Sequence, residues 1–137
     1  MKQALTTVRI VLVEDNPADV YLVETALRVN GIKFNMTCFE DGEKALKALS
    51  RHGSEAPDLI LLDLNLPKTD GVTVLGTIRA IPELAEVPVG IITSSESPAD
   101  MHRTAALGAA RYIKKPSTLD EFMREVGQGV ALMLSRN

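Results

Sequence analysis

The sequence lacks three features that would have pointed to other classes of protein. It has one cysteine, Cys38, among 137 residues, which excludes an internal disulfide and favours a reducing compartment such as the cytoplasm. It has no basic cluster and a formal net charge of −3, which argues against direct binding to nucleic acid. No apolar run approaches the ~20 residues of a membrane helix, and the polar amino terminus is unlike a signal peptide. We therefore expect a cytoplasmic protein without a membrane segment.

Short apolar runs alternate with helical patterns five times along the chain, which is long enough for one domain. The predicted strands are residues 8–13, 34–39, 59–62, 89–92 and 111–114. Asn16, Asp41, Ser97 and Thr118 stand where helix caps are expected. This order predicts an α/β fold, with a parallel sheet, helices on both faces and right-handed crossovers. The second strand has the weakest pattern, so we expect it near an edge of the sheet.

Charged residues directly follow three of the predicted strands. Glu14 and Asp15 follow the first strand, Asp63 the third and Lys115 the fifth. Ligands of open parallel sheets bind beyond the carboxyl ends of the strands, so these side chains should gather at one edge. Three carboxylates close together repel one another, and a hard cation such as Mg²⁺ would relieve that repulsion. The lysine then suits a phosphate group.

Asp63 is the candidate nucleophile, because a carboxylate can attack phosphorus and form an acyl phosphate. Asn65 can turn its backbone carbonyl toward the metal, and Thr93 can offer a hydroxyl to a phosphoryl oxygen. A cis bond between Lys115 and Pro116 would re-aim the lysine. Each residue alone has a plain alternative role in a turn or loop, and their combination favours the functional interpretation.

Other reactive side chains receive ordinary structural interpretations. We expect Cys38 to be buried in a strand. We expect His52 and His102 to be exposed, because no cysteine or carboxylate spacing makes them zinc ligands.

Together these motifs resemble the receiver domain of bacterial two-component response regulators, from residue 8 to about residue 134. The stretches that carry the resemblance are VLVED at 11–15, LDLNLP at 62–67, Asp70-Gly71, Thr93, Tyr112 and Lys115-Pro116. The resemblance implies a flavodoxin-like fold with five parallel strands in the order 2-1-3-4-5.

The resemblance also implies a mechanism. Asp63 would take a phosphoryl group from the phosphohistidine of a histidine kinase. Mg²⁺ would be held by Asp15, Asp63 and the carbonyl of Asn65, with Glu14 acting through water. Glu14 stands where many relatives have aspartate, which could loosen the metal geometry slightly.

A switch is implied as well. Thr93 would move toward the phosphoryl group and Tyr112 would turn inward, which would repack the surface of the fourth helix, fifth strand and fifth helix. From spacing alone, Tyr112 is a half-buried aromatic with a wet hydroxyl. Ser95 and Asn65 would flank the water path to the phosphate, and Ser95 would tune the signal lifetime in a direction that the sequence leaves open.

A narrower similarity concerns the partner. EDNPAD at 14–19, LNLPK at 64–68 and KPSTL at 115–119 are similar to stand-alone regulators paired with bacterial phytochromes. This similarity suggests a light-regulated kinase. The chain ends soon after the fifth helix, so we expect no output domain.

Two other functions are weighed against this one. An aspartate-nucleophile phosphohydrolase needs a second aspartate two residues after the nucleophile, where this chain has Asn65, and it needs a cap domain. A pseudo-receiver that never takes phosphate is disfavoured by the complete site. We therefore expect a protein that is not an enzyme.

The sequence of the last helix predicts that the protein associates with itself. Gly127 and Gly129 weaken that helix unless something packs on it, and the apolar run 130–134 is too wide for one small domain to cover. We expect a symmetric homodimer through the fourth helix, fifth strand and fifth helix. The alternative is a frayed carboxyl terminus.

Overall fold

The computed structural model describes residues 6–51 and 55–135, which are built around a five-stranded parallel sheet. Its strands are β1 (Val8–Val13), β2 (Phe34–Phe39), β3 (Leu59–Leu62), β4 (Val89–Thr93) and β5 (Arg111–Lys114). Their order in the sheet is β2-β1-β3-β4-β5, so the predicted flavodoxin-like topology is confirmed and β2 is an edge strand. The fourth strand runs one residue further than predicted, because Thr93 still pairs with Lys114 of β5.

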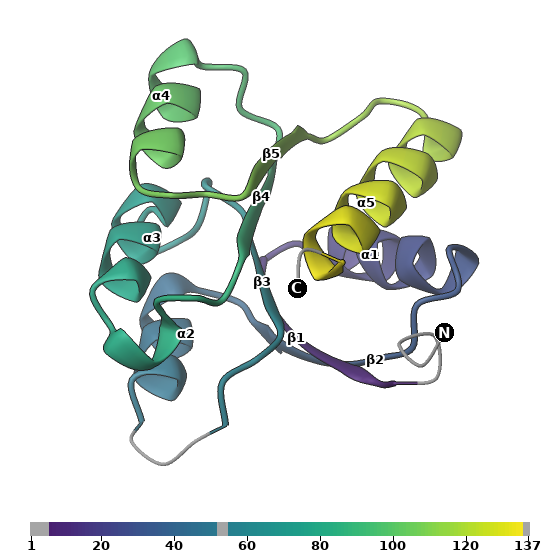
Figure 1. Ribbon diagram of the computed structural model, residues 1–137. Coiled ribbons are helices and arrows are strands. Elements are labelled where there is room, and N and C mark those ends of the chain that lie inside the picture. The colour runs from purple at the N-terminus through teal and green to yellow at the C-terminus, as the bar shows by residue number, and fades with distance from the viewer. Residues whose placement is uncertain (1–5, 52–54, 136–137) are drawn as a thin grey trace.

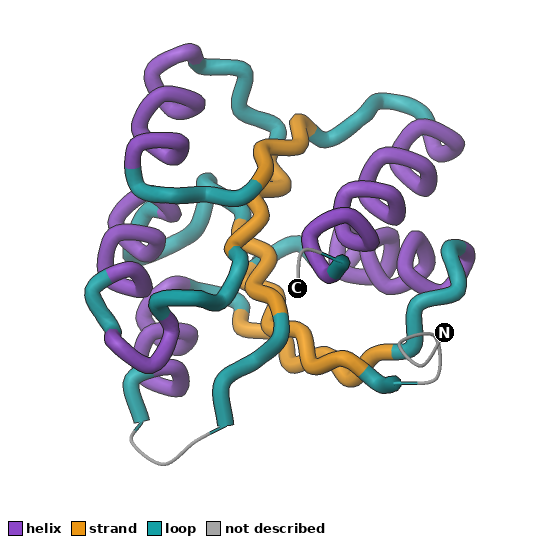
Figure 2. Tube along the Cα trace, viewed as in Figure 1, coloured by secondary structure: helices purple, strands orange, loops and turns teal. Residues whose placement is uncertain are grey.

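Helices cover both faces of the sheet. They are α1 (Pro17–Val29), α2 (Gly42–Leu49), α3 (Gly71–Arg79), α4 (Pro98–Ala106) and α5 (Leu119–Leu134). Figure 1 shows α1 and α5 on one face and α2, α3 and α4 on the other. The strands form the middle of the three layers (Figure 2).

The alternation of side chains along each strand divides the core into two halves. On β3, Leu59 and Leu61 pack into the cluster beneath α1 and α5. Ile60 and Leu62 pack into the cluster beneath α2 and α3. All four side chains are fully buried, and burying a side chain of this size contributes about 1.5–3 kcal/mol. A strand covered on both faces has to be apolar at every position, which explains the uninterrupted run.

The predicted caps set where the helices begin. Asn16, Asp41, Ser97 and Thr118 each accept a hydrogen bond from a backbone N–H in the first turn of the helix that follows. The caps satisfy N–H groups that have no partner inside the helix. Since each helix follows a strand, these amino-terminal turns lie near the carboxyl edge of the sheet.

The predicted burial of Cys38 is wrong. Cys38 lies in β2 as expected, but it is exposed. The edge strand has only β1 beside it, so its side chains receive less cover than those of the central strands. His102 is exposed as predicted, and His52 lies outside the described residues. Within residues 6–51 and 55–135, no helix has the length and apolar character needed to span a membrane.

Candidate functional site

The backbone aligns the carboxyl ends of the strands that precede the predicted site residues. The amide of Asp63 donates a hydrogen bond to the carbonyl of Val13 at 3.0 Å, and the amide of Lys115 donates to the carbonyl of Thr93 at 2.8 Å. These bonds continue the ladders one step past β3 and β5. The side chains that follow the strands therefore emerge at one edge, as the sequence predicted.

Lys115 is the centre of the site. Its Nζ donates hydrogen bonds to Asp19 Oδ2 at 2.8 Å, to Glu14 Oε1 at 2.9 Å and to Asp63 Oδ2 at 3.1 Å. The side chains of Lys115, Glu14 and Asp63 are only 13%, 3% and 6% exposed. Burial of charged groups is tolerated when they are paired in this way.

Three carboxylates form a group that suits a cation. Glu14, Asp15 and Asp63 each offer a ligand oxygen, and these oxygens lie within 4.8 Å of one another. Burial of the carboxyl, together with the smaller effect of the nearby Asp63 charge, raises the pKa of Glu14 to about 7 against the opposing hydrogen bond from Lys115. Hard oxygen donors in such a group fit a divalent cation such as Mg²⁺.

The Lys115 amine remains charged despite its burial. Burial lowers its pKa, but the hydrogen bonds to Asp19 and Glu14 and the nearby charges outweigh that effect, so the pKa lies above its usual value. The peptide bond before Pro116 is trans, as are all peptide bonds in the described residues. The cis bond that the sequence allowed is therefore absent. The orientation of the Lys115 amine is set by its hydrogen bonds to three carboxylates.

The loop after β3 packs tightly against the candidate nucleophile. The amide of Asn65 donates a hydrogen bond to Asp63 Oδ1 at 3.1 Å, so the chain bends back at the position that the sequence indicated. A Cβ at Gly71 would collide with the carbonyl oxygen of Asp63. The amino terminus of α3 therefore lies directly against the end of β3.

Thr93 and Tyr112 are both hydrogen-bonded to the same residue, Ser95. Thr93 is fully buried, and its Oγ1 accepts a hydrogen bond from the Ser95 amide at 3.3 Å. The Tyr112 hydroxyl donates to the Ser95 carbonyl at 2.9 Å. The Ser95 hydroxyl donates to Asp100 Oδ2 at 2.6 Å, which ties this loop to α4. The sequence drew attention to Ser95, but it gave no indication of Asp100.

Asp19 is the site residue that sequence reasoning missed. It lies in the first turn of α1, four positions after Asp15, and it reaches Lys115 from there. An acid in the first turn of a helix that starts at this edge was the available signal. Favourable placement of acids near helix amino termini is common, so that signal alone could not assign a role.

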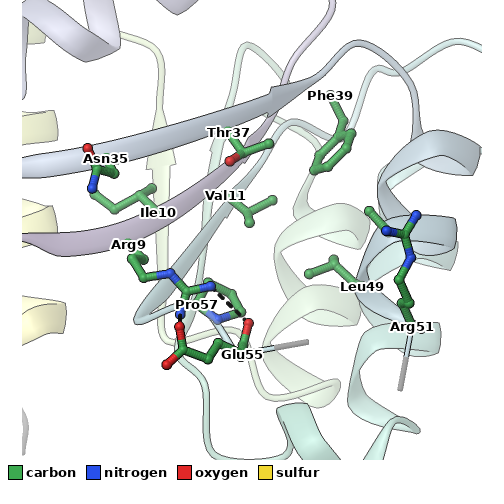
Figure 3. A pocket seen from close by; sticks show the side chains of 11 residues that line it. Arg9, Ile10, Val11, Asn35, Thr37, Phe39, Leu49, Arg51, Glu55 and Pro57 are labelled. Carbon is green, nitrogen blue, oxygen red and sulfur yellow. Dashed lines mark hydrogen bonds and ion pairs between the residues drawn. The ribbon is translucent and has the colours of Figure 1, made fainter. Parts of the chain in front are cut away.

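A separate cavity of about 330 Å³ is lined by residues of β1, of β2 as far as its last residue Phe39, of the end of α2 and of the loop before β3 (Figure 3). One of its two arginines, Arg9, donates hydrogen bonds to the carbonyls of Glu55 and Ala56 and pairs with the Glu55 carboxylate at 3.2 Å. These contacts hold the strand β1 to the loop before β3. None of the site residues above lines this cavity.

A doubly wound parallel sheet with an acidic group and a lysine at its carboxyl edge is typical of receiver domains. The model of the response regulator receiver domain family matches residues 10–127. The chain belongs to this family, as the resemblance in the sequence predicted.

Individual relatives agree with this assignment. The chain is 38% identical over 125 residues to response regulator Rcp1 from Synechocystis, covering 88% of this chain and 84% of Rcp1. It matches the crystal structure of the phosphorylated cyanobacterial phytochrome response regulator RcpA with a TM-score of 0.88 and 34% identity, over 96% of this chain and 97% of RcpA. It matches the Mn²⁺-bound form of Rcp1 with a TM-score of 0.85 and 34% identity, over 95% and 96% of the two chains.

Proposed function

We propose that this response regulator accepts a phosphoryl group on Asp63 from a histidine kinase in the cytoplasm, and that the group switches a protein-binding surface. One observation carries the proposal. Asp63 Oδ2 lies 3.1 Å from the Lys115 ammonium, and Glu14 and Asp15 stand beside it. A nucleophile, a counter-charge for phosphate and a group of metal ligands are thus combined at the end of a buried strand.

The metal that we propose is Mg²⁺, held by Glu14, Asp15, Asp63 and the carbonyl of Asn65. When bound, it supplies positive charge that offsets the charge on the phosphoryl oxygens. The donor set consists of oxygens, which suits a hard cation. The Mn²⁺-bound form of Rcp1 supports a divalent ion as the occupant of this site. So does the receiver domain of sensor histidine kinase PA1611, which has magnesium coordinated in its active site cleft and matches this chain with a TM-score of 0.71 and 29% identity.

In the transfer step, a carboxylate oxygen of Asp63 forms a bond to phosphorus while the bond from phosphorus to the histidine nitrogen breaks. The electron pair of that bond returns to the imidazole, so charge and atoms balance. Lys115 offsets charge on the transferred oxygens, and its Nζ lies beside them because it is 3.1 Å from Asp63 Oδ2. The buried position of Asp63 limits the access of water to the product.

The switch uses the contacts around Ser95. Thr93 Oγ1 accepts from the Ser95 amide, and its own proton remains available for a phosphoryl oxygen on Asp63. A movement of the Thr93 side chain toward that oxygen would therefore pull on the bond to the Ser95 amide. Ser95 in turn holds Tyr112 and, through Asp100, the start of α4. A local electrostatic event can therefore repack the surface of α4, β5 and α5.

We propose a phytochrome kinase as the partner. The cyanobacterial phytochrome response regulator RcpA supports this, and so does the bacteriophytochrome response regulator RtBRR, which matches with a TM-score of 0.78 and 30% identity over 96% of this chain and 80% of RtBRR. Phosphotransfer from a panel of purified histidine kinases tests it. Equal or faster transfer from kinases outside the phytochrome class would contradict this choice of partner.

We also propose a homodimer through α4, β5 and α5. Leu132 on α5 is 53% exposed. Leu119 on α5 and Met101 on α4 are exposed as well. Large exposed apolar side chains on the two helices that flank the edge strand β5 are typical of an interface. The net charge of −3 argues against nucleic acid as a partner.

We do not assign a phosphohydrolase activity. Asn65 occupies the position where such enzymes carry an acid, and an amide cannot exchange a proton with the leaving group.

The central test is labelling with acetyl phosphate and Mg²⁺, followed by phosphate-affinity electrophoresis. Wild type should give a shifted band and Asp63→Asn should give none, because the variant keeps the shape but loses the nucleophile. Asp120→Asn, which removes an exposed acid from α5, should label like wild type. Lys115→Ala should label slowly yet fail to show phosphorylation-dependent association. An undiminished band for Asp63→Asn would refute the assignment.

A further inference from the structure

Asp19 is the third acidic partner of Lys115, and the proposed transfer reaction gives it no role. Its Oδ2 accepts a hydrogen bond from Lys115 Nζ at 2.8 Å, across 96 positions of sequence. Its side chain is 22% exposed, so it is more accessible than Glu14 or Asp63. Within the described residues, the acids that can gather around a cation are Glu14, Asp15 and Asp63, without Asp19.

The hydrogen-bonding capacity of the amine is fully used. An ammonium group has three N–H donors and no acceptor. The oxygens of Glu14, Asp19 and Asp63 take one donor each. Lys115 therefore has no donor left for a phosphoryl oxygen, and contact with one requires that an existing bond be released or shared.

The three hydrogen bonds of Lys115 are not equivalent once a cation and a phosphoryl group are bound. Glu14 and Asp63 belong to the group that can hold a cation, so metal binding and phosphorylation redirect their oxygens. Asp19 has no such second use, and its bond is as short as the others. It therefore remains the carboxylate with which a phosphoryl oxygen has to share the amine.

We propose that Asp19 is a positioning residue that competes with the phosphoryl group for the Lys115 amine and so lowers the affinity of the site for a phosphoryl-like anion. This inference rests on the proposed phosphorylation of Asp63. Asp19 acts through Lys115 and through its own negative charge, which repels an anionic group at Asp63.

The variant Asp19→Asn tests the charge of Asp19 and its bond to Lys115 without changing how the side chain packs. Asparagine keeps the shape and can still accept a hydrogen bond, but a bond to an uncharged acceptor is weaker than one to a carboxylate. The amine becomes freer to turn, and one negative charge is lost. Both effects favour anion binding. We expect the affinity for beryllofluoride, a mimic of the phosphoryl group, to rise roughly tenfold, which corresponds to about 1.4 kcal/mol.

The experiment is calorimetric titration of the full chain with beryllofluoride at saturating Mg²⁺, and separately with Mg²⁺ alone. The variants are Asp19→Asn and Asp19→Ala. The matched control is Glu24→Gln, which removes one charge from the same helix at a residue that pairs with Arg28 at 3.7 Å. If Asp19 had a purely structural role, the variants would bind both beryllofluoride and Mg²⁺ more weakly. Competition instead predicts a higher affinity for beryllofluoride and an unchanged or slightly lower affinity for Mg²⁺.

Tighter beryllofluoride binding by both Asp19 variants, with Glu24→Gln within about twofold of wild type, supports the inference. Unchanged or weaker anion binding by both variants overturns it. An equal rise in Glu24→Gln also overturns it, because the effect would then belong to net charge. If wild type binds Mg²⁺ but no beryllofluoride, the proposed phosphorylation itself fails and the inference falls with it.

Discussion

The Tyr112 hydroxyl donates a 2.9 Å hydrogen bond to the Ser95 carbonyl, and this bond joins β5 to the loop between β4 and α4. The same loop carries the amide that binds the Thr93 hydroxyl. Thr93 lies at the end of the strand next to the one that precedes Asp63, so a change at the phosphoacceptor can reach the aromatic ring through Thr93 and Ser95. The Ser95 side chain extends the connection to Asp100 on α4.

Tyr112→Phe should lower the free energy of unfolding by about 1 kcal/mol, because it removes one intramolecular hydrogen bond and little else. Labelling of Asp63 by acetyl phosphate should proceed as in wild type. Urea denaturation measures the first effect. Tyr21→Phe is the control, since Tyr21 is 64% exposed and its change should lie near zero. Equal stability of the two variants would show that the bond to Ser95 contributes nothing measurable.

Mg²⁺ affinity should depend on pH near neutrality. Burial raises the pKa of Glu14 to about 7, so below that pH the carboxyl holds a proton that must leave before it can face a cation. The affinity is therefore full above pH 7 and weakens as the pH falls through it, by up to about tenfold per unit. Calorimetry at pH 8 and pH 6 measures the difference. Glu14→Gln removes the titration, and a persisting pH dependence in that variant would assign it to another group.

Gly127→Ala should destabilise the fold although alanine favours helices. A Cβ at Gly127 would collide with the side chain of Asn30, whose amide donates to the Ala26 carbonyl at 2.8 Å and to the Met123 carbonyl at 3.0 Å. Such overpacking costs about 1–3 kcal/mol. Gly76→Ala is the matched control in α3, where the nearest atom lies at 3.9 Å.

The control should gain up to about 1 kcal/mol from helix propensity. Urea denaturation should therefore give opposite signs for the two substitutions. The same sign for both would mean that the contact between α1 and α5 adapts to the added methyl group.

Leu132→Glu should abolish the proposed homodimer without unfolding the chain, since this side chain is 53% exposed on α5. Light scattering over a concentration series, with and without beryllofluoride, measures the mass. Val29→Glu is the control, because Val29 is 66% exposed on α1, outside the proposed interface. A wild type that stays monomeric at high micromolar concentration, even with the mimic bound, rules the dimer out.

Much of the site could be predicted from sequence because it depends on strand ends. Glu14, Asp63 and Lys115 each follow an apolar run, and parallel strands necessarily finish at the same edge. Their proximity therefore follows from one-dimensional information once the sheet is parallel. Cys38 could not be treated in the same way, since its burial depends on how much of the edge strand the neighbouring elements cover.

The sequence by itself determined the class of fold, the order of elements and the residues that reach the carboxyl edge, because side-chain periodicity and helix caps are local properties. Only the tertiary structure decided that Asp19 joins Lys115 and that Ser95 connects Tyr112 to Asp100. Those contacts depend on the angle at which α1 and α4 lie on the sheet. That angle results from packing across the whole core, so no short stretch of sequence contains it.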